Sequence, residues 1–143
     1  MKKYLLIFLV YCFSLTVISC GTKDDTSNNT STESSTYSDN GTTFTVTVNS
    51  SKYYIDGILT KSLNLKKGYT YYFDSTDSTT NNHPLFIGTT SSGGSYTYEY
   101  TSGVTNSRTT NDTLTFVVPS DSPSTLYYNC GNHVSMGGSI TIN

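Results

Sequence analysis

Short segments of alternating apolar and polar residues, separated by turn-forming residues, constrain the fold of this chain most. In residues 43–48 (Thr-Phe-Thr-Val-Thr-Val) the apolar side chains all fall on one face of an extended strand. Residues 52–55 then lead into Asp56-Gly57, a dipeptide that favours a tight hairpin, and residues 58–59 lead back. Because apolar residues at every second position do not form the stripe of an amphipathic helix, we expect an all-β protein.

Segments of this kind recur along the rest of the chain, with a turn signal roughly every 8–12 residues. The further strand candidates are residues 63–65, 69–73, 84–87, 113–118, 125–130 and 139–142. The composition, with 13 Tyr, no Trp and many Ser, Thr and Asn residues, also suits pleated strands joined by polar turns. The pattern predicts a Greek-key β-sandwich of about seven or eight strands.

A Gly- and Ser-rich stretch, residues 88–103, interrupts this pattern. We expect it to form a long loop with one edge strand. It contains Tyr96, Tyr98 and Tyr100, whose alternation is typical of tyrosines packed on a sheet. The alternative is a contact surface for a ligand or another protein, since tyrosine combines an apolar ring with a polar tip.

The first residues of the chain have the pattern of an export signal. Two lysines precede an apolar run, residues 4–18, which is short for a membrane span but typical of a signal peptide. The run ends in Val-Ile-Ser-Cys at residues 17–20, which resembles the lipobox of bacterial lipoproteins. The resemblance implies a lipoprotein signal peptide over residues 1–19 and lipidation of Cys20. The alternative is an ordinary signal peptide with a chance cysteine near its end.

The residues that follow Cys20 are almost wholly polar and cannot bury enough apolar surface to offset the entropy of ordering. We therefore expect a lipidated, disordered tether over residues 20–40 and one folded domain over residues 41–143. Lys23-Asp24-Asp25 resembles the surface-export signals of some Gram-negative lipoproteins. The expected location is the envelope of a Gram-negative bacterium, in the outer membrane, with the domain in the periplasm or at the cell surface.

The charge of the chain restricts its partners. The net charge is −2 and 13% of the residues are charged. Because binding to nucleic acid depends on clustered Lys and Arg that neutralise phosphates, nucleic acid is not expected as a partner.

Four residues of scarce types stand out as candidates for chemistry. The chain has two histidines, His83 and His133, and Met136 is its only methionine after the initiator. Cys130 is its only cysteine outside the export segment. An unpaired cysteine in an exported protein is a metal ligand, a reactive thiol or an inert core residue. Taken singly, His83 reads as a turn residue and Met136 as a side chain that fills a gap.

The spacing of these residues indicates a single metal site. Cys130, His133 and Met136 lie three residues apart between two predicted strands, where neighbouring glycines let the chain bend. His83 precedes another strand, and a sandwich gathers strand ends at one pole. A thiolate and two imidazoles with a weak thioether suit copper, whereas zinc rarely uses methionine. The set predicts one mononuclear copper site.

Over residues 43–143 this pattern resembles the cupredoxins, the blue copper family that includes plastocyanin, amicyanin and azurin. In that family the first His lies on an early loop, and Cys, His and Met lie on the loop before the last strand. The resemblance implies one type 1 copper, with His83, Cys130 and His133 as equatorial ligands and Met136 as the axial ligand. It also implies one-electron transfer to and from redox partner proteins, with His133 as the exit. We expect the protein to be a monomer.

The chain departs from the family pattern at one position. The residue after the first His is commonly Asn, whose backbone N–H reaches the Cys sulfur, but here it is Pro84, which has no N–H. Because hydrogen bonds to a ligand tune the potential of the metal, we expect a somewhat lower reduction potential than in a relative that has this bond.

Other functions remain open at this point. A sandwich without metal could serve as a surface adhesion or binding module through its tyrosines, and the same four ligands could deliver or store Cu(I) as a copper chaperone or storage protein. An enzyme is not expected, because multicopper oxidases and nitrite reductases need more histidines. Nucleophilic catalysis by Cys130 and His133 is disfavoured, because a base three residues away on a tight loop is badly placed.

Overall fold

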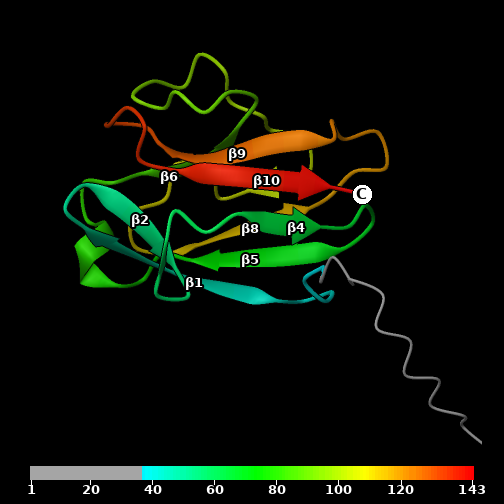
Figure 1. The fold of residues 1–143 in the computed structure, drawn as a ribbon, viewed down its shortest axis with the longest axis horizontal. Coiled ribbons are helices and arrows are strands. Elements are labelled where there is room, and N and C mark those ends of the chain that lie inside the picture. The colour runs from blue at the N-terminus through cyan, green and yellow to red at the C-terminus, as the bar shows by residue number, and fades with distance from the viewer. Residues whose placement is uncertain (1–36) are drawn as a thin grey trace, which may run out of the picture. The chain divides into compact units, whose positions relative to one another are not determined.

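The computed structural model describes residues 37–143, which form two β-sheets packed face to face (Figure 1). In chain order the elements are β1 (Thr43–Asn49), β2 (Lys52–Ile55), β3 (Ile58–Leu59), β4 (Leu63–Leu65), β5 (Thr70–Asp74), the short 3-10 helix η1 (Ser78–Thr80), β6 (Leu85–Gly88), β7 (Val104–Thr105), β8 (Thr113–Val117), β9 (Thr125–Cys130) and β10 (Gly138–Ile142). The predicted signal peptide, Cys20 and the tether up to residue 36 lie outside the described residues.

The strand order confirms the predicted all-β sandwich. One sheet has the order β3-β2-β1-β5-β8-β7 and the other β4-β10-β9-β6. The pairs β1–β5 and β4–β10 are parallel and the other pairs are antiparallel. Successive strands from β3 to β7 alternate between the two sheets, so each connection in this part of the chain crosses from one sheet to the other. The structure has ten strands over residues 37–143, more than the seven or eight expected, and two of them, β3 and β7, have only two residues each.

The predicted hairpin at Asp56-Gly57 is confirmed. β2 and β3 pair through Ile55 and Ile58, and the two turn residues have φ of 51° and 77°. A two-residue turn with φ > 0 at both positions matches the right-handed twist of the strands, and Gly57 adopts such a φ without steric cost. The hairpin forms one edge of the six-stranded sheet.

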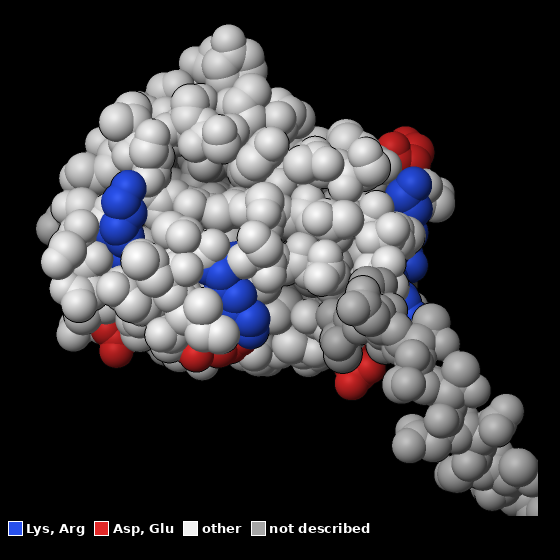
Figure 2. Space-filling view, in the orientation of Figure 1, with Lys and Arg blue, Asp and Glu red and all other residues white. Residues whose placement is uncertain are grey.

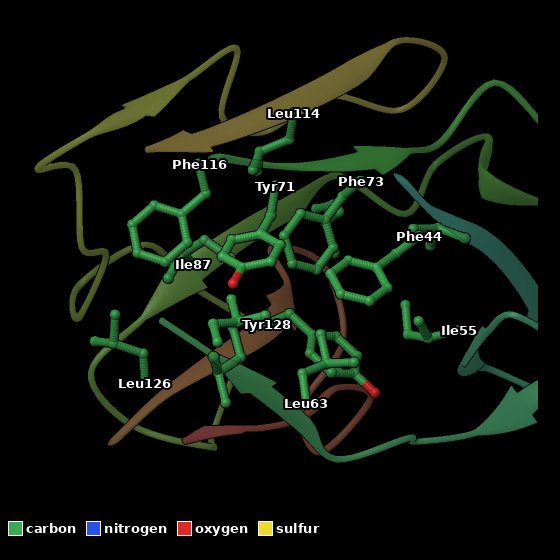
Figure 3. Packing of buried hydrophobic residues seen from close by; sticks show 14 of the residues in the cluster. Phe44, Ile55, Leu63, Tyr71, Phe73, Ile87, Leu114, Phe116, Leu126 and Tyr128 are labelled. Atoms are coloured by element: carbon green, nitrogen blue, oxygen red, sulfur yellow. The ribbon is translucent and has the colours of Figure 1, made fainter. Parts of the chain in front are cut away.

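The core lies between the sheets and is built from the residues that alternation placed inward (Figure 3). The six-stranded sheet contributes Phe44, Val46, Tyr53, Ile55, Tyr71, Phe73, Leu114 and Phe116, and the four-stranded sheet contributes Leu63, Leu65, Leu85, Ile87, Leu126, Tyr128, Cys130, Ile140 and Ile142. The ring centroids of Phe44 and Phe73 are 5.2 Å apart, a distance typical of favourable aromatic pairs.

Three tyrosines of this core donate their hydroxyls to backbone carbonyls. Tyr71 donates to Ser38 over 2.9 Å and Tyr128 to Lys61 over 2.9 Å. Tyr53, which is fully buried, donates to His83 over 2.6 Å. Because a buried hydroxyl without a partner is costly, these bonds let large amphipathic rings occupy the interior.

The tyrosines of residues 88–103 do not form the predicted edge strand, although two of them pack on residues of the sheets. Tyr96 packs edge-on against Phe86, Tyr98 is 55% exposed, and Tyr100 packs edge-on against Phe116. All three lie in the predicted long loop, which runs from β6 to β7 without a further strand. Regular spacing of aromatic residues gave a false strand signal because Gly93 and Gly94, both with positive φ, bend the loop.

Over residues 37–143, no helix is long and apolar enough to span a membrane.

The two leucines Leu114 and Leu59 test how far the core stabilises the fold. Leu114 is fully buried and Leu59 is 51% exposed. Leu114→Ala should lower the free energy of unfolding by about 2–5 kcal/mol, through lost burial and the cavity it leaves. Leu59→Ala, the matched control, should change it by less than about 0.5 kcal/mol. Urea denaturation measures both, and equal effects would contradict the assigned core.

Candidate metal centre

Strand pairing brings three of the four predicted ligands together. β6 and β9 are antiparallel neighbours, and Leu85, the first residue of β6, lies opposite Cys130, the last residue of β9. His83 lies two residues before Leu85 and therefore falls beside Cys130, and His133 lies in the loop that follows. The ligand atoms of His83, Cys130 and His133 all lie within 4.8 Å of one another.

The distances between these atoms fit a metal ion. The Cys130 sulfur lies 3.5 Å from Nδ1 of His133 and 3.9 Å from Nδ1 of His83. A metal about 2.3 Å from a sulfur and about 2.0 Å from a nitrogen, at an angle of about 110–120°, holds the two atoms roughly 3.5–3.7 Å apart. The two observed distances bracket this range. Both imidazoles thus present Nδ1 to the place where a metal would bind.

Hydrogen bonds tie the two ligand-bearing segments to each other. The Gly131 N–H donates to the Pro84 carbonyl over 2.8 Å, one step beyond the last paired residues of β6 and β9. The Asn132 side-chain amide donates to the Asn82 carbonyl over 2.8 Å. Each bond joins a residue next to His83 with a residue between Cys130 and His133. The segment that carries His83 is therefore fixed to the loop that carries His133.

The site combines a buried sulfur with two partly buried imidazoles. Cys130 is fully buried, whereas His83 and His133 are of intermediate exposure. Burial, followed by the nearby His133, lowers the pKa of His83 below its ordinary value. A lowered pKa means that His83 stays neutral at neutral pH, and neutral imidazole is the form that binds metal.

Met136 lies at the same end of the fold but enters the site differently. It is fully buried, and its carbonyl accepts a hydrogen bond of 3.1 Å from the Tyr53 N–H. The chain turns sharply here, with Ser135 at φ 53° before it and Gly137 after it. At Gly137 a Cβ would lie 1.6 Å from the Tyr128 carbonyl oxygen, so only glycine fits. The axial role of Met136 stays a prediction.

A second layer covers the outer face of β6 and β9, and nothing in the sequence placed it beside the candidate ligands. Phe86 is buried on this face, and the Tyr96 ring packs edge-on against it at 5.2 Å. Arg108 lies 4.2 Å from the centre of the Tyr96 ring and forms a salt bridge of 2.6 Å with Glu99. Tyr96 and Glu99 come from the long loop between β6 and β7, and Arg108 comes from the connection between β7 and β8.

This outer layer touches the ligand loop directly. The Tyr96 ring lies over Gly131, where an added Cβ would fall 2.1 Å from the tyrosine hydroxyl oxygen. The Gly94 N–H donates to the Cys130 carbonyl over 2.9 Å, and the Ser135 N–H donates to the Ser92 carbonyl over 2.8 Å. Gly131 is therefore required for close approach, a role that its place beside Cys130 could have suggested but not shown.

Comparisons with known proteins give distant similarities. No protein-family model matches the chain, and no curated protein matches it. A solved structure of reduced rusticyanin has 14% sequence identity and a TM-score of 0.46, with 75% of this chain and 83% of the other covered. Rusticyanin from Thiobacillus ferrooxidans has 14% identity and a TM-score of 0.44, with 73% and 79% covered. The assignment of the site therefore rests on the geometry described above.

The described residues have the two-sheet sandwich and the donor group that the cupredoxin resemblance in the sequence implied. The resemblance seen in the sequence is confirmed on two points, the two-sheet sandwich and the grouping of two histidines with one cysteine. The donor set of one thiolate and two imidazoles, near a buried thioether residue, fits copper better than zinc or a hard cation.

The contact between Gly131 and Tyr96 gives a test of the outer layer. Gly131→Ala forces the Tyr96 ring away from its place on Phe86 and should lower the free energy of unfolding by about 1–3 kcal/mol. When Tyr96 is first changed to Ala, the same substitution should cost less than about 0.5 kcal/mol, because the two residues then no longer clash. Urea denaturation of the four proteins gives the coupling. Independent effects would contradict the contact.

Proposed function

We propose that this protein is a blue copper electron carrier, in which His83, Cys130 and His133 hold one type 1 copper and Met136 is the axial ligand. The observation that carries the proposal is the grouping of the three donor atoms at metal-binding distances. When bound, copper supplies a one-electron couple between Cu(II) and Cu(I). A thiolate with two imidazoles and a weak axial ligand is the donor set typical of electron-transfer copper sites.

The protein contributes a rigid and partly dry surrounding. The Cys130 thiol lies in the core, away from water, and hydrogen bonds on both sides hold the ligand loop. A site whose donors are fixed by packing changes little between oxidation states, which favours rapid transfer.

His133 is the proposed exit for the electron. It lies in the loop after β9, and the next residue, Val134, is 71% exposed. A redox partner that docks on this end of the sandwich would approach the imidazole without opening the core. The face in Figure 2 shows charged side chains of both signs in small separate groups, which favours a protein partner over nucleic acid there.

A visible absorption spectrum of the purified protein tests the proposal. After loading with Cu(II), the protein should show an intense visible band from charge transfer between the thiolate and copper. Cys130→Ser removes the thiolate at nearly constant size, so this variant should lose the band. His133→Ala should weaken the site without removing the sulfur.

Two results would lead to another function. If neither Cu(II) nor Cu(I) binds tightly, the electron-carrier proposal is wrong and a metal-free binding module takes its place. If Cu(I) binds but exchanges rapidly with other copper proteins, and no stable Cu(II) form exists, the protein is a copper chaperone or storage protein.

We further propose that the domain is tethered to a Gram-negative envelope through lipid on Cys20, as the export pattern of the sequence indicates. Expressed in a Gram-negative host with a labelled fatty acid, the protein should carry the label and sediment with membranes. Cys20→Ser should lose both properties, whereas Cys12→Ser, within the apolar run, should keep them. An unlabelled, soluble wild-type protein would contradict the anchor.

A further inference from the structure

Strand β2 of the six-stranded sheet contacts both segments that carry the candidate ligands. The Tyr53 hydroxyl donates to the His83 carbonyl over 2.6 Å, and the Tyr53 backbone N–H donates to the Met136 carbonyl over 3.1 Å. The neighbouring Lys52 ammonium donates to the Ser135 carbonyl. Two consecutive residues of β2 therefore hold the start of β6 and the end of the ligand loop at once.

Tyr53 is itself held firmly in the core. Its side chain is fully buried, and burial raises its pKa well above the ordinary value. Its hydrogen bonds reach His83 and Met136, two of the four candidate ligands. These ligands lie on the four-stranded sheet or its loops, so Tyr53 acts across the sandwich.

The need for such a contact follows from Pro84. A residue with a backbone N–H at this position could fix the His83 segment to Cys130, but proline has none to donate. The Pro84 carbonyl instead accepts from Gly131, which ties the strands but leaves the His83 carbonyl free. The Tyr53 hydroxyl donates its hydrogen bond to this His83 carbonyl. Because the hydroxyl is the end of a ring packed in the core, it has little freedom to move.

We propose that Tyr53 is a positioning residue of the metal centre, whose hydroxyl and backbone N–H fix His83 and Met136 against Cys130. The inference rests on the proposed function where it concerns copper, and on the contacts alone where it concerns the metal-free site. Removal of the hydroxyl leaves the buried His83 carbonyl without this partner and releases the His83 segment from β2. The segments that surround Cys130, those carrying His83 and Met136, then open more often, even though the core keeps its shape.

The chain offers a matched control in Tyr128. It is also a fully buried core tyrosine, and its hydroxyl also donates to a backbone carbonyl, that of Lys61, which is remote from the ligands in the sequence. Tyr53→Phe and Tyr128→Phe each remove one oxygen atom and one hydrogen bond of the same kind. If the two variants differ in the properties of the site, the difference comes from where the lost hydroxyl lay and not from the loss of a hydroxyl as such.

The first measurement is the rate at which iodoacetamide alkylates Cys130 in the metal-free protein, with the free energy of unfolding measured beside it. Tyr53→Phe should raise the rate about tenfold beyond what its loss of global stability explains, since local opening at the site becomes easier. Tyr128→Phe should raise the rate only as far as its own loss of stability requires. Equal rates after this correction would overturn the proposal.

The second measurement is the visible spectrum and the rate of copper loss to a chelator. Tyr53→Phe should change the relative intensities of the thiolate bands and release copper about tenfold faster, whereas Tyr128→Phe should leave both unchanged within about twofold. Identical spectra and release rates in both variants would overturn the role at the metal. If the wild-type protein binds no copper, the proposed function fails, and the alkylation rates alone decide whether Tyr53 positions the ligands.

A second variant keeps the test open if Tyr53→Phe does not fold. Lys52→Met removes the contact with the Ser135 carbonyl from a side chain at the surface, without touching the core. It should raise the alkylation rate of Cys130 by a smaller factor, about threefold. No change in this rate would mean that β2 does not hold the ligand loop.

Discussion

The antiparallel pairing of β6 with β9 is the contact on which the candidate metal centre depends. Its register sets Leu85 opposite Cys130, so that His83 falls beside the sulfur. Successive residues of a strand point to opposite faces, and a slip of one residue would therefore turn Cys130 out of the core. The inward-facing residues of these strands, among them Ile87 and Tyr128, fix the register through their burial. The packing that stabilises the sandwich thus also sets the distances between the donors.

Around this pairing the ligand loop is held from two sides. On the inner side, β2 contacts it through Lys52 and Tyr53, and on the outer side the long loop after β6 covers it with Tyr96 and the backbone of Gly94. The loop itself contributes only a few residues between β9 and β10, of which Met136 packs in the core. Its rigidity therefore comes from neighbours far away in the sequence. This arrangement suits a site that should keep its geometry while an electron enters and leaves.

Polarity decreases from the surface to the sulfur. Val134 and the loop around His133 are open to solvent, the imidazoles are partly covered, and Cys130 is fully buried. Burial also lowers the pKa of His83, which favours the neutral imidazole that binds a metal. A partner that docks at this end would thus come close to the His133 imidazole, whereas the Cys130 sulfur is shielded from oxidants and water. This separation supports the proposed role in electron transfer.

The sequence by itself determined the elements and the donor set. Period-two alternation predicted most of the strands and Asp56-Gly57 predicted one hairpin, because these signals are local. The scarcity of His, Cys and Met residues marked the candidate ligands His83, Cys130, His133 and Met136. Tertiary structure alone decided the roles of Tyr53 and Tyr96, which look like ordinary aromatic residues in the sequence. Tyr53 acts on a residue 30 positions away, in the other sheet. Such contacts depend on sheet order and on how the two sheets face each other, and no local pattern of residues specifies either.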